Sequence, residues 1–516
     1  MKYFKCLLAS IFLFAAACGG VESDGGKYSL PVEFTEKSYT ADGAAAYEGN
    51  SPYSGLDETG KYLVSDGVPL LMLGGQLRTD FFMQLEGKTI DELDQYFKLA
   101  REMNVTMVQI PICWSDIETA KGVYSVEYVE KYIEYCEKYE LKLELLWFGS
   151  WMCGVSVAGY IPQYVMNDQD TYQAINRNMY NGWLGKTWML MPNCAATLER
   201  ERLAMQAMMD GIYAYDRMHG GRHTVVGIQV ENEPDMLLIP HEEDYPENFE
   251  YTTDEVCAEL IKHLDELGQV VKDSKYKCYT RVNLTDRAYL SYLSEELPKM
   301  AGIDYVGLDP YNNKVNKISA QLDVLAALEG NFPHIAENGG EYENNDQLEL
   351  LAFTKGAGYE VFEVVTTYSP ELVDWELRGV FHTDFSKKPH TQRLIDANKI
   401  YRDGFLDLVL AGEGKVLGFN LMTSGGQDKV TQTLTADGIS ITHATTERGI
   451  AYAAVRGKVV TLASTKADTF TINADALYCE KGYYSMDGVW HKEKSVSVKG
   501  GKLKVEATGV YRVLVA

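Results

Sequence analysis

Between about residues 61 and 400, short apolar runs of strand length are separated by longer stretches in which apolar residues recur at helical spacing, as at Leu93, Phe97 and Ala100. The runs predict eight strands, at 69–77, 106–113, 142–148, 224–230, 277–283, 305–309, 334–337 and 359–365. The stretches between them include predicted helices at 90–103, 126–139, 198–219 and 254–272. Strands that alternate with helices indicate a parallel sheet, and eight such units predict a (β/α)8 TIM barrel, which we assign to 46–405.

One other α/β architecture fits the same alternation, an open doubly wound sheet. That fold is expected to show a G-x-G-x-x-G turn after its first strand, and the sequence has none. After residue 411 the pattern changes to short β-like runs between Gly, Asp and Lys turns, at 416–421, 430–434, 450–455, 459–463, 469–472, 496–498, 503–505 and 511–515. We therefore predict a C-terminal all-β, sandwich-like domain at 411–516, which either packs on the barrel or binds carbohydrate.

The N-terminus has the pattern of an export signal. Lys2 and Lys5 precede a short apolar stretch at 7–17, which is too short to span a bilayer. The stretch ends in Ala-Ala-Ala-Cys18-Gly and resembles the bacterial lipoprotein box. The resemblance implies a lipoprotein signal peptide at 1–18, diacylation of Cys18 and a tether and lead-in at 19–45; an ordinary cleavage site is the alternative. We expect a chain exported and lipid-anchored to a bacterial envelope membrane, at the periplasmic face or the cell surface.

The composition narrows the partners. Lys+Arg 48 against Asp+Glu 74 gives 48 − 74 = −26, a charge that repels nucleic acid and anionic lipid. A neutral substrate such as a carbohydrate fits better, and a membrane is expected only through the lipid anchor. The nine cysteines form no C-x-x-C pair, so we expect no metal and no cofactor. A single disulfide, for example between Cys153 and Cys194, stays open.

Two predicted strands end in carboxylates. In a parallel barrel the active site lies at the C-terminal ends of the strands. The fourth run continues into Glu231-Asn232-Glu233-Pro234, and the seventh ends at Glu337. A pair of carboxyl groups on opposite strands is what glycoside hydrolysis needs, one as acid and one as base or nucleophile. Strand alternation places Glu231 and Glu233 on the same side, so periodicity does not decide between them.

These motifs resemble the four/seven barrel superfamily of glycoside hydrolases, in which Asn-Glu ends strand four and Glu ends strand seven. More closely, Leu-Gly-Gly-Gln-Leu-Arg at 73–78, Pro-Ile-Cys-Trp-Ser-Asp-Ile-Glu at 111–118 and Val-Gly-Ile-Gln-Val-Glu-Asn-Glu at 226–233 look like strand signatures of the family 35 β-galactosidases and the related family 42. The resemblance implies that Glu233 is the acid/base and Glu337 the nucleophile. Those families carry an acid before Trp at the end of strand three, and the segment 145–151 has none. This departure resembles a divergent bacterial branch, family 35-like, that acts on plant polysaccharide side chains.

Further roles follow from the chemistry of the reaction. Asn232 should bond the sugar 2-hydroxyl, and Tyr311 should orient Glu337 and lower its pKa by hydrogen bonding. Other candidate sugar contacts are Trp114, Trp147, Trp151, Arg78, Gln76 and Glu118. The three tryptophans could equally be packing residues, and Arg78 could instead pair with a barrel carboxylate. The prediction is a retaining exo-β-glycosidase, a β-galactosidase acting on plant-type poly- or oligosaccharide side chains. A β-glycosidase of other specificity, exo or endo, and a non-catalytic polysaccharide-binding lipoprotein remain open.

Overall fold

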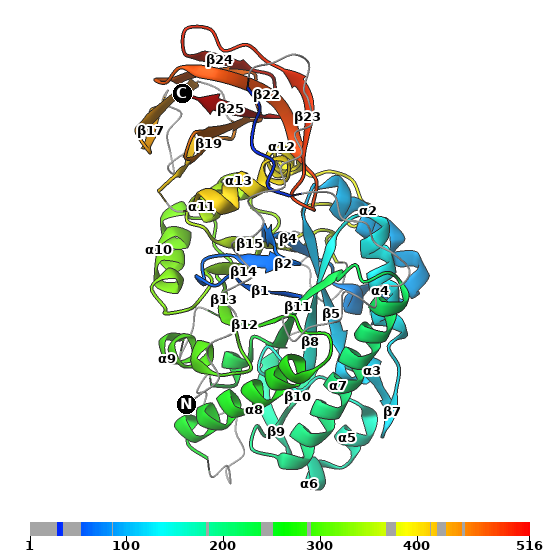
Figure 1. The fold of residues 1–516 in the computed structure, drawn as a ribbon. Helices are drawn as coiled ribbons and strands as arrows, with labels where there is room; N and C mark the ends of the chain where they lie inside the picture. The colour runs from blue at the N-terminus through cyan, green and yellow to red at the C-terminus, as the bar shows by residue number, and fades with distance from the viewer. Residues whose placement is uncertain are drawn as a thin grey trace, which may run out of the picture.

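A computed structural model describes residues 28–34, 53–84, 86–181, 185–238, 251–285, 290–367, 378–412, 414–419, 430–445 and 449–516. Eight parallel strands form a closed barrel (Figure 1), which confirms the predicted fold. The barrel strands are β4 (Leu73–Gln76), β5 (Met107–Cys113), β8 (Lys142–Met152), β11 (Val225–Asn232), β12 (Tyr279–Thr285), β13 (Tyr305–Asp309), β14 (His334–Gly339) and β15 (Gly358–Phe362). Each of the eight predicted runs overlaps one of them, and pairing of β15 with β4 closes the ring.

Helices cover the outside of the barrel (Figure 1). They are α1 (Thr79–Gln84), η2 (Ile90–Leu93), α2 (Asp94–Glu102), α3 (Trp114–Ile117), α4 (Glu127–Lys138), α5 (Gln163–Asn167), α6 (Gln169–Tyr172), α7 (Ala195–Met218), η3 (Pro234–Leu238), α8 (Thr253–Asp273), α9 (Leu290–Glu296), η5 (Leu297–Lys299), α10 (Val315–Ala326), α11 (Asn345–Thr354), α12 (Thr391–Asp403) and α13 (Phe405–Ala411). All four predicted helices are present. In the part of the chain that the structure describes, no helix has both the length and the apolar character to cross a membrane.

The first predicted strand is split in two. Its beginning forms β3 (Val68–Leu70), which pairs with β2 (Leu63–Ser65), and β2 pairs with β1 (Ser54–Leu56). Leu63 and Leu70 of this small sheet pack with Tyr279 and Tyr305 at the starts of β12 and β13. The small sheet therefore covers the N-terminal end of the barrel, opposite the strand ends that carry the candidate site. Two further antiparallel pairs are β6 (Glu118–Ala120) with β7 (Val123–Tyr124) and β9 (Ala174–Asn181) with β10 (Gly185–Leu190).

Inside the barrel a charged layer lies among the strands. Arg281 of β12 donates to Glu144 of β8 at 2.8 and 2.6 Å and to Gln229 of β11 at 2.6 Å. All three side chains are fully buried. Because a buried charge is costly unless it is paired and hydrogen-bonded, this layer ties the three strands together. Arg281 also lies close enough to the strand ends to lower the pKa of Glu337.

Two antiparallel sheets follow the barrel and pack face to face, as predicted for a sandwich-like domain. The first contains β16 (Val416–Phe419), β19 (Ala451–Arg456), β20 (Val459–Ser464), β25 (Gly509–Val515), β22 (Ala476–Tyr484) and β23 (Trp490–Ser495). The second contains β17 (Val430–Ala436), β18 (Ile439–Thr445), β21 (Asp468–Ile472) and β24 (Lys502–Val505). The predicted strand at 496–498 is wrong, since these residues follow the end of β23 and belong to no strand. Prediction missed β18, β22 and β23, whose sequences are rich in polar residues.

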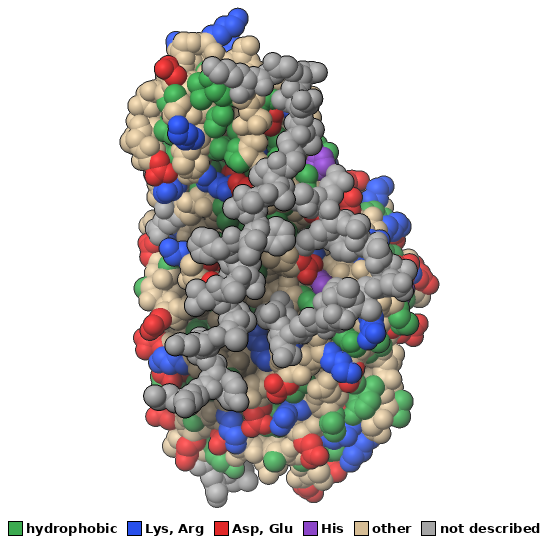
Figure 2. All heavy atoms as spheres, viewed as in Figure 1, with side chains coloured by type: hydrophobic (Ala, Val, Ile, Leu, Met, Phe, Trp, Pro, Cys, Tyr) green, Lys and Arg blue, Asp and Glu red, His purple; other side chains and the backbone are tan. Residues whose placement is uncertain are grey.

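The sandwich is fixed to the barrel by buried contacts. Helix α11 is buried along Asn345–Phe353, between the barrel and β16. Asp407 of α13 is 1% exposed and accepts hydrogen bonds from Arg456 at 2.6 Å, Thr461 at 2.6 Å and Tyr484 at 3.1 Å. The sandwich therefore has a clear packing role. On the face seen in Figure 2, acidic and basic side chains are interspersed rather than gathered into areas of one sign.

Candidate active site

Glu337 is held at the end of β14 by two hydrogen bonds. Its side chain is 5% exposed. Oε1 accepts from Nε2 of Gln76 at 3.0 Å, and Oε2 accepts from the hydroxyl of Tyr311 at 2.5 Å. Gln76 ends β4 and Tyr311 follows β13, so the carboxylate is gripped from strands on both sides of β14. A register shift between Ile335 and Asn338 in the pairing with β15 surrounds Glu337, and such bulges re-aim side chains next to active sites.

The electrostatics of Glu337 combine opposing effects. Burial raises its pKa, while the hydrogen bonds from Tyr311 and Gln76 and the charges of Arg78 and Arg281 lower it. The net pKa lies above the usual value for a glutamate. The hydrogen bond from Tyr311 thus lowers the pKa of Glu337, as predicted, but the effect of burial is larger. The ionised form of Glu337 is therefore stabilised by its two hydrogen-bond donors and by the two nearby arginines.

Glu233 belongs to the same site. It follows β11 with a φ of +44° and is half-buried. Its backbone N–H donates to Oδ1 of Asn283 at 3.0 Å. The charges of Glu233 and Glu337 together raise the pKa values of Asp309 and Tyr311, and both act on the thiol of Cys153. The structure therefore brings the two predicted carboxyl groups to one place at the C-terminal ends of the strands.

Asn283 of β12 connects the C-terminal ends of the two neighbouring strands, β11 and β13, by hydrogen bonds. Its Nδ2 donates to Oδ1 of Asn232 at 3.1 Å and to Oδ2 of Asp309 at 2.6 Å, while its Oδ1 receives the N–H of Glu233. Nδ2 of Asn232 approaches Sγ of Cys153 at 3.6 Å. Sequence reasoning missed Asn283 and Asp309, although each is the last residue of a predicted strand, at the position where barrel enzymes carry site residues.

Glu231 does not share a side with Glu233, and the alternation argument is wrong here. Glu231 has a φ of +63°, and the register of β11 on β8 shifts between Val230 and Asn232. The extra residue of this bulge aims Glu231 away from the strand ends. Its two carboxylate oxygens accept the N–H groups of Ser150 and Trp151, both at 2.8 Å. It is fully buried.

Behind the strands, Glu231 lies beside a second buried carboxyl group, that of Glu201. Burial and the charge of Glu201, on α7, raise the pKa of Glu231 well above its usual value. Burial opposes ionisation of Glu201 too, but hydrogen bonds from His263 and Ser150 lower its pKa to about 2. Nε2 of His263, on α8, lies 3.0 Å from Oε2 of Glu201. The two buried carboxyl groups therefore shift in opposite directions, with the pKa of Glu231 raised and that of Glu201 lowered.

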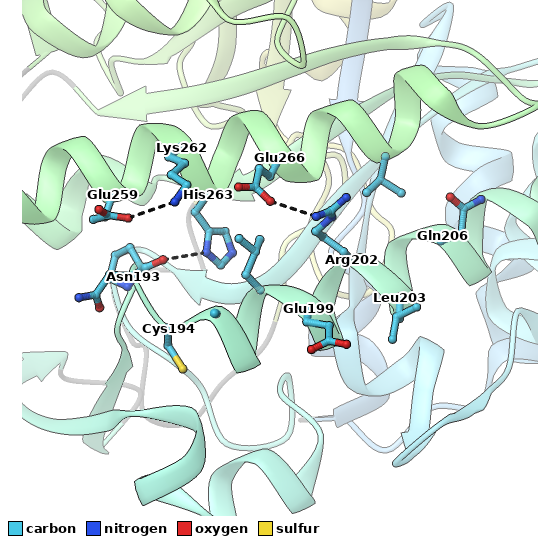
Figure 3. Close-up of a pocket in the computed structure, with 14 residues that line it drawn as sticks. Asn193, Cys194, Glu199, Arg202, Leu203, Gln206, Glu259, Lys262, His263 and Glu266 are labelled. Carbon is cyan, nitrogen blue, oxygen red and sulfur yellow. Dashed lines mark hydrogen bonds and ion pairs between the residues drawn. The ribbon is translucent and has the colours of Figure 1, made fainter.

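Glu201, Glu231 and His263 are, among the described residues, the group whose ligand atoms could hold a metal ion, all within 4.8 Å of one another. Their oxygens are already engaged by N–H and O–H donors, so hydrogen bonding accounts for the arrangement. A cleft of about 430 Å³ between α7 and α8 reaches His263 (Figure 3). Ion pairs between Arg202 and Glu266 and between Lys262 and Glu259 line it. None of the candidate active-site residues lines this cleft.

The three tryptophans are packing residues in this structure. Trp114, Trp147 and Trp151 are all fully buried. Their indole N–H groups donate to Oε2 of Glu118 at 3.0 Å, to Oε1 of Glu201 at 2.8 Å and to the carbonyl of Leu190 at 2.9 Å. None of them has an exposed ring face, which favours the packing role that the sequence left open.

Glu118 and Arg78 are also committed to other residues. Glu118 is fully buried and accepts from Trp114, from the Tyr164 hydroxyl at 2.9 Å, from the Gly122 N–H at 2.8 Å and from Arg200. Arg78 makes a two-point ion pair with Asp80, at 2.9 and 2.7 Å. Of the six predicted sugar contacts, Gln76 is the one that bonds a candidate catalytic carboxylate directly.

Within β8, the backbone at Gly149 leaves no room for a side chain. A Cβ atom on Gly149 would lie 1.8 Å from Oε1 of Glu201 and 2.6 Å from Oε1 of Glu231. The backbone therefore passes too close to two buried carboxyl groups for any side chain at 149. Cys153 and Cys194, in the same region, are both free, so the possible disulfide between them is absent.

Together the fold and the site define a (β/α)8 barrel with a two-carboxylate site at the strand ends. A family model for a domain of unknown function, DUF4978, matches residues 260–374. No curated protein matches the sequence.

Solved structures with similar folds include three glycoside hydrolases. An exo-β-1,4-mannosidase from Opitutaceae bacterium strain TAV5 is 12% identical over 67% of this chain and 62% of its own, with a TM-score of 0.48. A β-galactosidase from the psychrophilic Marinomonas ef1 is 10% identical over 64% and 59%, with a TM-score of 0.49. A family 39 glycoside hydrolase from the gut symbiont Bacteroides cellulosilyticus WH2 is 12% identical over 88% and 84%, with a TM-score of 0.42. At these levels of similarity the neighbours assign neither a reaction nor a substrate to this chain.

Proposed function

We propose that the chain is a retaining β-glycosidase in which Glu337 is the nucleophile and Glu233 the acid/base. The observation that carries the proposal is the buried Glu337 carboxylate, oriented by Tyr311 and Gln76 and facing the same site as Glu233. Retention requires the two carboxyl groups to lie roughly 5–5.5 Å apart. The non-catalytic alternative is disfavoured because two hydrogen bonds, from Tyr311 and Gln76, fix the orientation of the Glu337 carboxylate. A barrel that served only as a scaffold would not need an oriented carboxylate at this position.

The reaction follows from these positions. An oxygen of Glu337 forms a bond to the anomeric carbon while the glycosidic C–O bond breaks, and the proton of Glu233 goes to the leaving oxygen. Water then attacks the anomeric carbon and gives a proton back to Glu233, and Glu337 leaves as the carboxylate. The net change is one glycoside and one water converted into a sugar of retained β configuration and an alcohol. In this proposal Asn232, whose Oδ1 accepts from Asn283, bonds the 2-hydroxyl.

For the substrate, we propose exo-cleavage of a terminal β-galactose from a plant-type poly- or oligosaccharide side chain. Support comes from the family 35-like strand signatures. Comparing kcat/KM on 4-nitrophenyl β-galactoside, β-glucoside and β-mannoside tests it. A preference for galactoside of one to two decades, roughly 1.4–2.8 kcal/mol at the transition state, is expected. Equal rates would remove galactose, and no turnover of any glycoside would contradict the glycosidase itself.

Tyr311→Phe should shift the acid limb of the pH profile to higher pH. Glu337 works in its ionised form, so kcat/KM falls as pH drops through its pKa. The Tyr311 hydroxyl lowers that pKa, and its removal therefore raises it. At the optimum, kcat/KM should fall roughly tenfold, about 1.4 kcal/mol for one hydrogen bond to a charge. Tyr305→Phe is the matched control: Tyr305 begins β13, the strand that Tyr311 follows, and its hydroxyl approaches Sδ of Met72 instead. An unmoved acid limb in Tyr311→Phe would contradict the assigned role.

We further propose that Cys18 is the lipidated N-terminus; it lies outside the described residues. The lipoprotein-like box at its position supports this. Cells that express the unmodified chain should retain it in the membrane fraction, and Cys18→Ala should appear in the soluble fraction. If both proteins fractionate identically, the anchor is assigned wrongly.

A further inference from the structure

Asp309, at the end of β13, is a third carboxyl group of the site, and the reaction described above does not use it. The side chain is 4% exposed. Oδ2 accepts from Nδ2 of Asn283 at 2.6 Å, whereas the buried Oδ1 has no hydrogen-bond partner among the residues that the structure describes. Buried polar atoms are nearly always hydrogen-bonded, and an unpaired one costs free energy. An unpaired oxygen beside two candidate catalytic carboxylates indicates a place for a hydrogen-bonding group of the ligand.

A second unpaired oxygen lies on the other side of Glu337. Gln76 uses its Nε2 to bond Glu337, and its buried Oε1 has no partner within the described part of the chain. Asp309 belongs to β13, which pairs with β14, while Gln76 belongs to β4, two strands away in the opposite direction. Unpaired acceptors on both sides of the nucleophile suit a ligand with several hydroxyl groups.

The charge state of Asp309 decides which groups it can bind. Burial raises its pKa well above the usual range, and the charges of Glu337 and Glu233 raise it further. The charge of Arg281 and the hydrogen bond from Asn283 oppose this shift without cancelling it. A protonated carboxyl group offers one O–H donor and free acceptor positions. That combination matches a hydroxyl group, which also donates and accepts.

The orientation of Asp309 is fixed by the residue that also positions the acid/base. Asn283 holds Oδ2 of Asp309 and the N–H of Glu233 at the same time. Asp309 therefore has little freedom to turn its Oδ1 toward another protein group.

We propose that Asp309 is a specificity-determining residue whose carboxyl group hydrogen-bonds one ring hydroxyl of a neutral sugar held between Glu233 and Glu337. The inference rests on the proposed glycosidase function and deepens it. A neutral sugar is favoured over a uronate, because the ionised Glu337 in the same site would repel a second carboxylate.

The test measures the coupling between Asp309 and each hydroxyl group. The substrates are the 4-nitrophenyl β-glycoside that the unmodified chain turns over fastest and its 2-, 3-, 4- and 6-deoxy analogues. In the unmodified chain, removal of the bonded hydroxyl should lower kcat/KM roughly 10- to 100-fold. In Asp309→Ala the parent glycoside should fall by a similar factor, and the deoxy penalty at that one position should nearly vanish. Asp304→Ala is the control, since Asp304 lies just before the start of the same strand and pairs with Lys272; its four penalties should match those of the unmodified chain.

The results distinguish a failure of this inference from a failure of the proposed function. Unchanged penalties at all four positions in Asp309→Ala would overturn this inference while turnover of the parent upholds the proposed function. No turnover of any parent glycoside by the unmodified chain would overturn both. If circular dichroism shows that Asp309→Ala does not fold, Asp309→Asn replaces it. That variant keeps the side-chain shape but alters the donor, so it should change the penalty at one position, and four unchanged penalties would again overturn the inference.

Discussion

Glu337→Ala should lower kcat on every aryl β-glycoside by roughly four orders of magnitude or more. The nucleophile forms the bond to the anomeric carbon, and the nearby carboxyl groups serve other purposes: Glu233 carries the proton and Asp309 is bonded to Asn283. KM should change far less, because the sugar hydroxyl contacts remain. Stopped-assay kinetics with purified protein, after circular dichroism shows a native fold, measure this loss.

The product formed with added azide identifies the role. In Glu337→Ala a small anion can enter the space left by the carboxylate and attack the anomeric carbon directly, which gives an α-glycosyl azide with one inversion. Glu343→Ala is the matched control, an exposed glutamate six residues along the chain that should leave kcat unchanged. NMR of the first sugar released by the unmodified chain should show the β anomer. Initial release of the α anomer would rule out double displacement.

The sequence predicted the parts of the molecule that regular periodicity controls. Eight apolar runs became eight barrel strands, because a strand buried on both faces is mostly apolar. Polar strands were missed for the corresponding reason. β23 runs Trp-His-Lys-Glu-Lys-Ser at the edge of its sheet, where charge is tolerated and apolar patterning is not required.

At the candidate site, the sequence predicted some side-chain contacts and not others. The contact between Tyr311 and Glu337 followed from positions at the ends of strands six and seven. The direction of the Glu231 side chain could not be predicted. A bulge with positive φ at this residue breaks the alternation of side chains along the strand, and no residue type in the segment indicates a bulge. The role of Trp147 stayed open because its partner, Glu201, lies on a helix 54 positions later in the chain, and local sequence pattern does not show such a contact.

Glu233→Ala should separate substrates by their leaving groups. An activated aryl group departs with little protonation, so its glycosylation step should slow modestly. An alkyl or sugar leaving group needs the proton, so kcat/KM on such substrates should fall by roughly three to four orders of magnitude. The variant also lacks the base that activates water. Its glycosyl-enzyme should therefore accumulate on activated substrates, and kcat and KM should fall together.

Azide should partly rescue Glu233→Ala, because this nucleophile needs no base, and the product should be the β-glycosyl azide after two inversions. Glu231→Gln is the matched control two residues away. Burial and the charge of Glu201 raise the pKa of Glu231, whose oxygens accept two backbone N–H groups, and a neutral glutamine amide keeps the shape of the side chain. Its dependence on the leaving group should match that of the unmodified chain. If Glu231→Gln instead lost activity on poor leaving groups while Glu233→Ala remained fully active, the acid would be Glu231, and the bulge at the end of β11 would aim the catalytic group the other way.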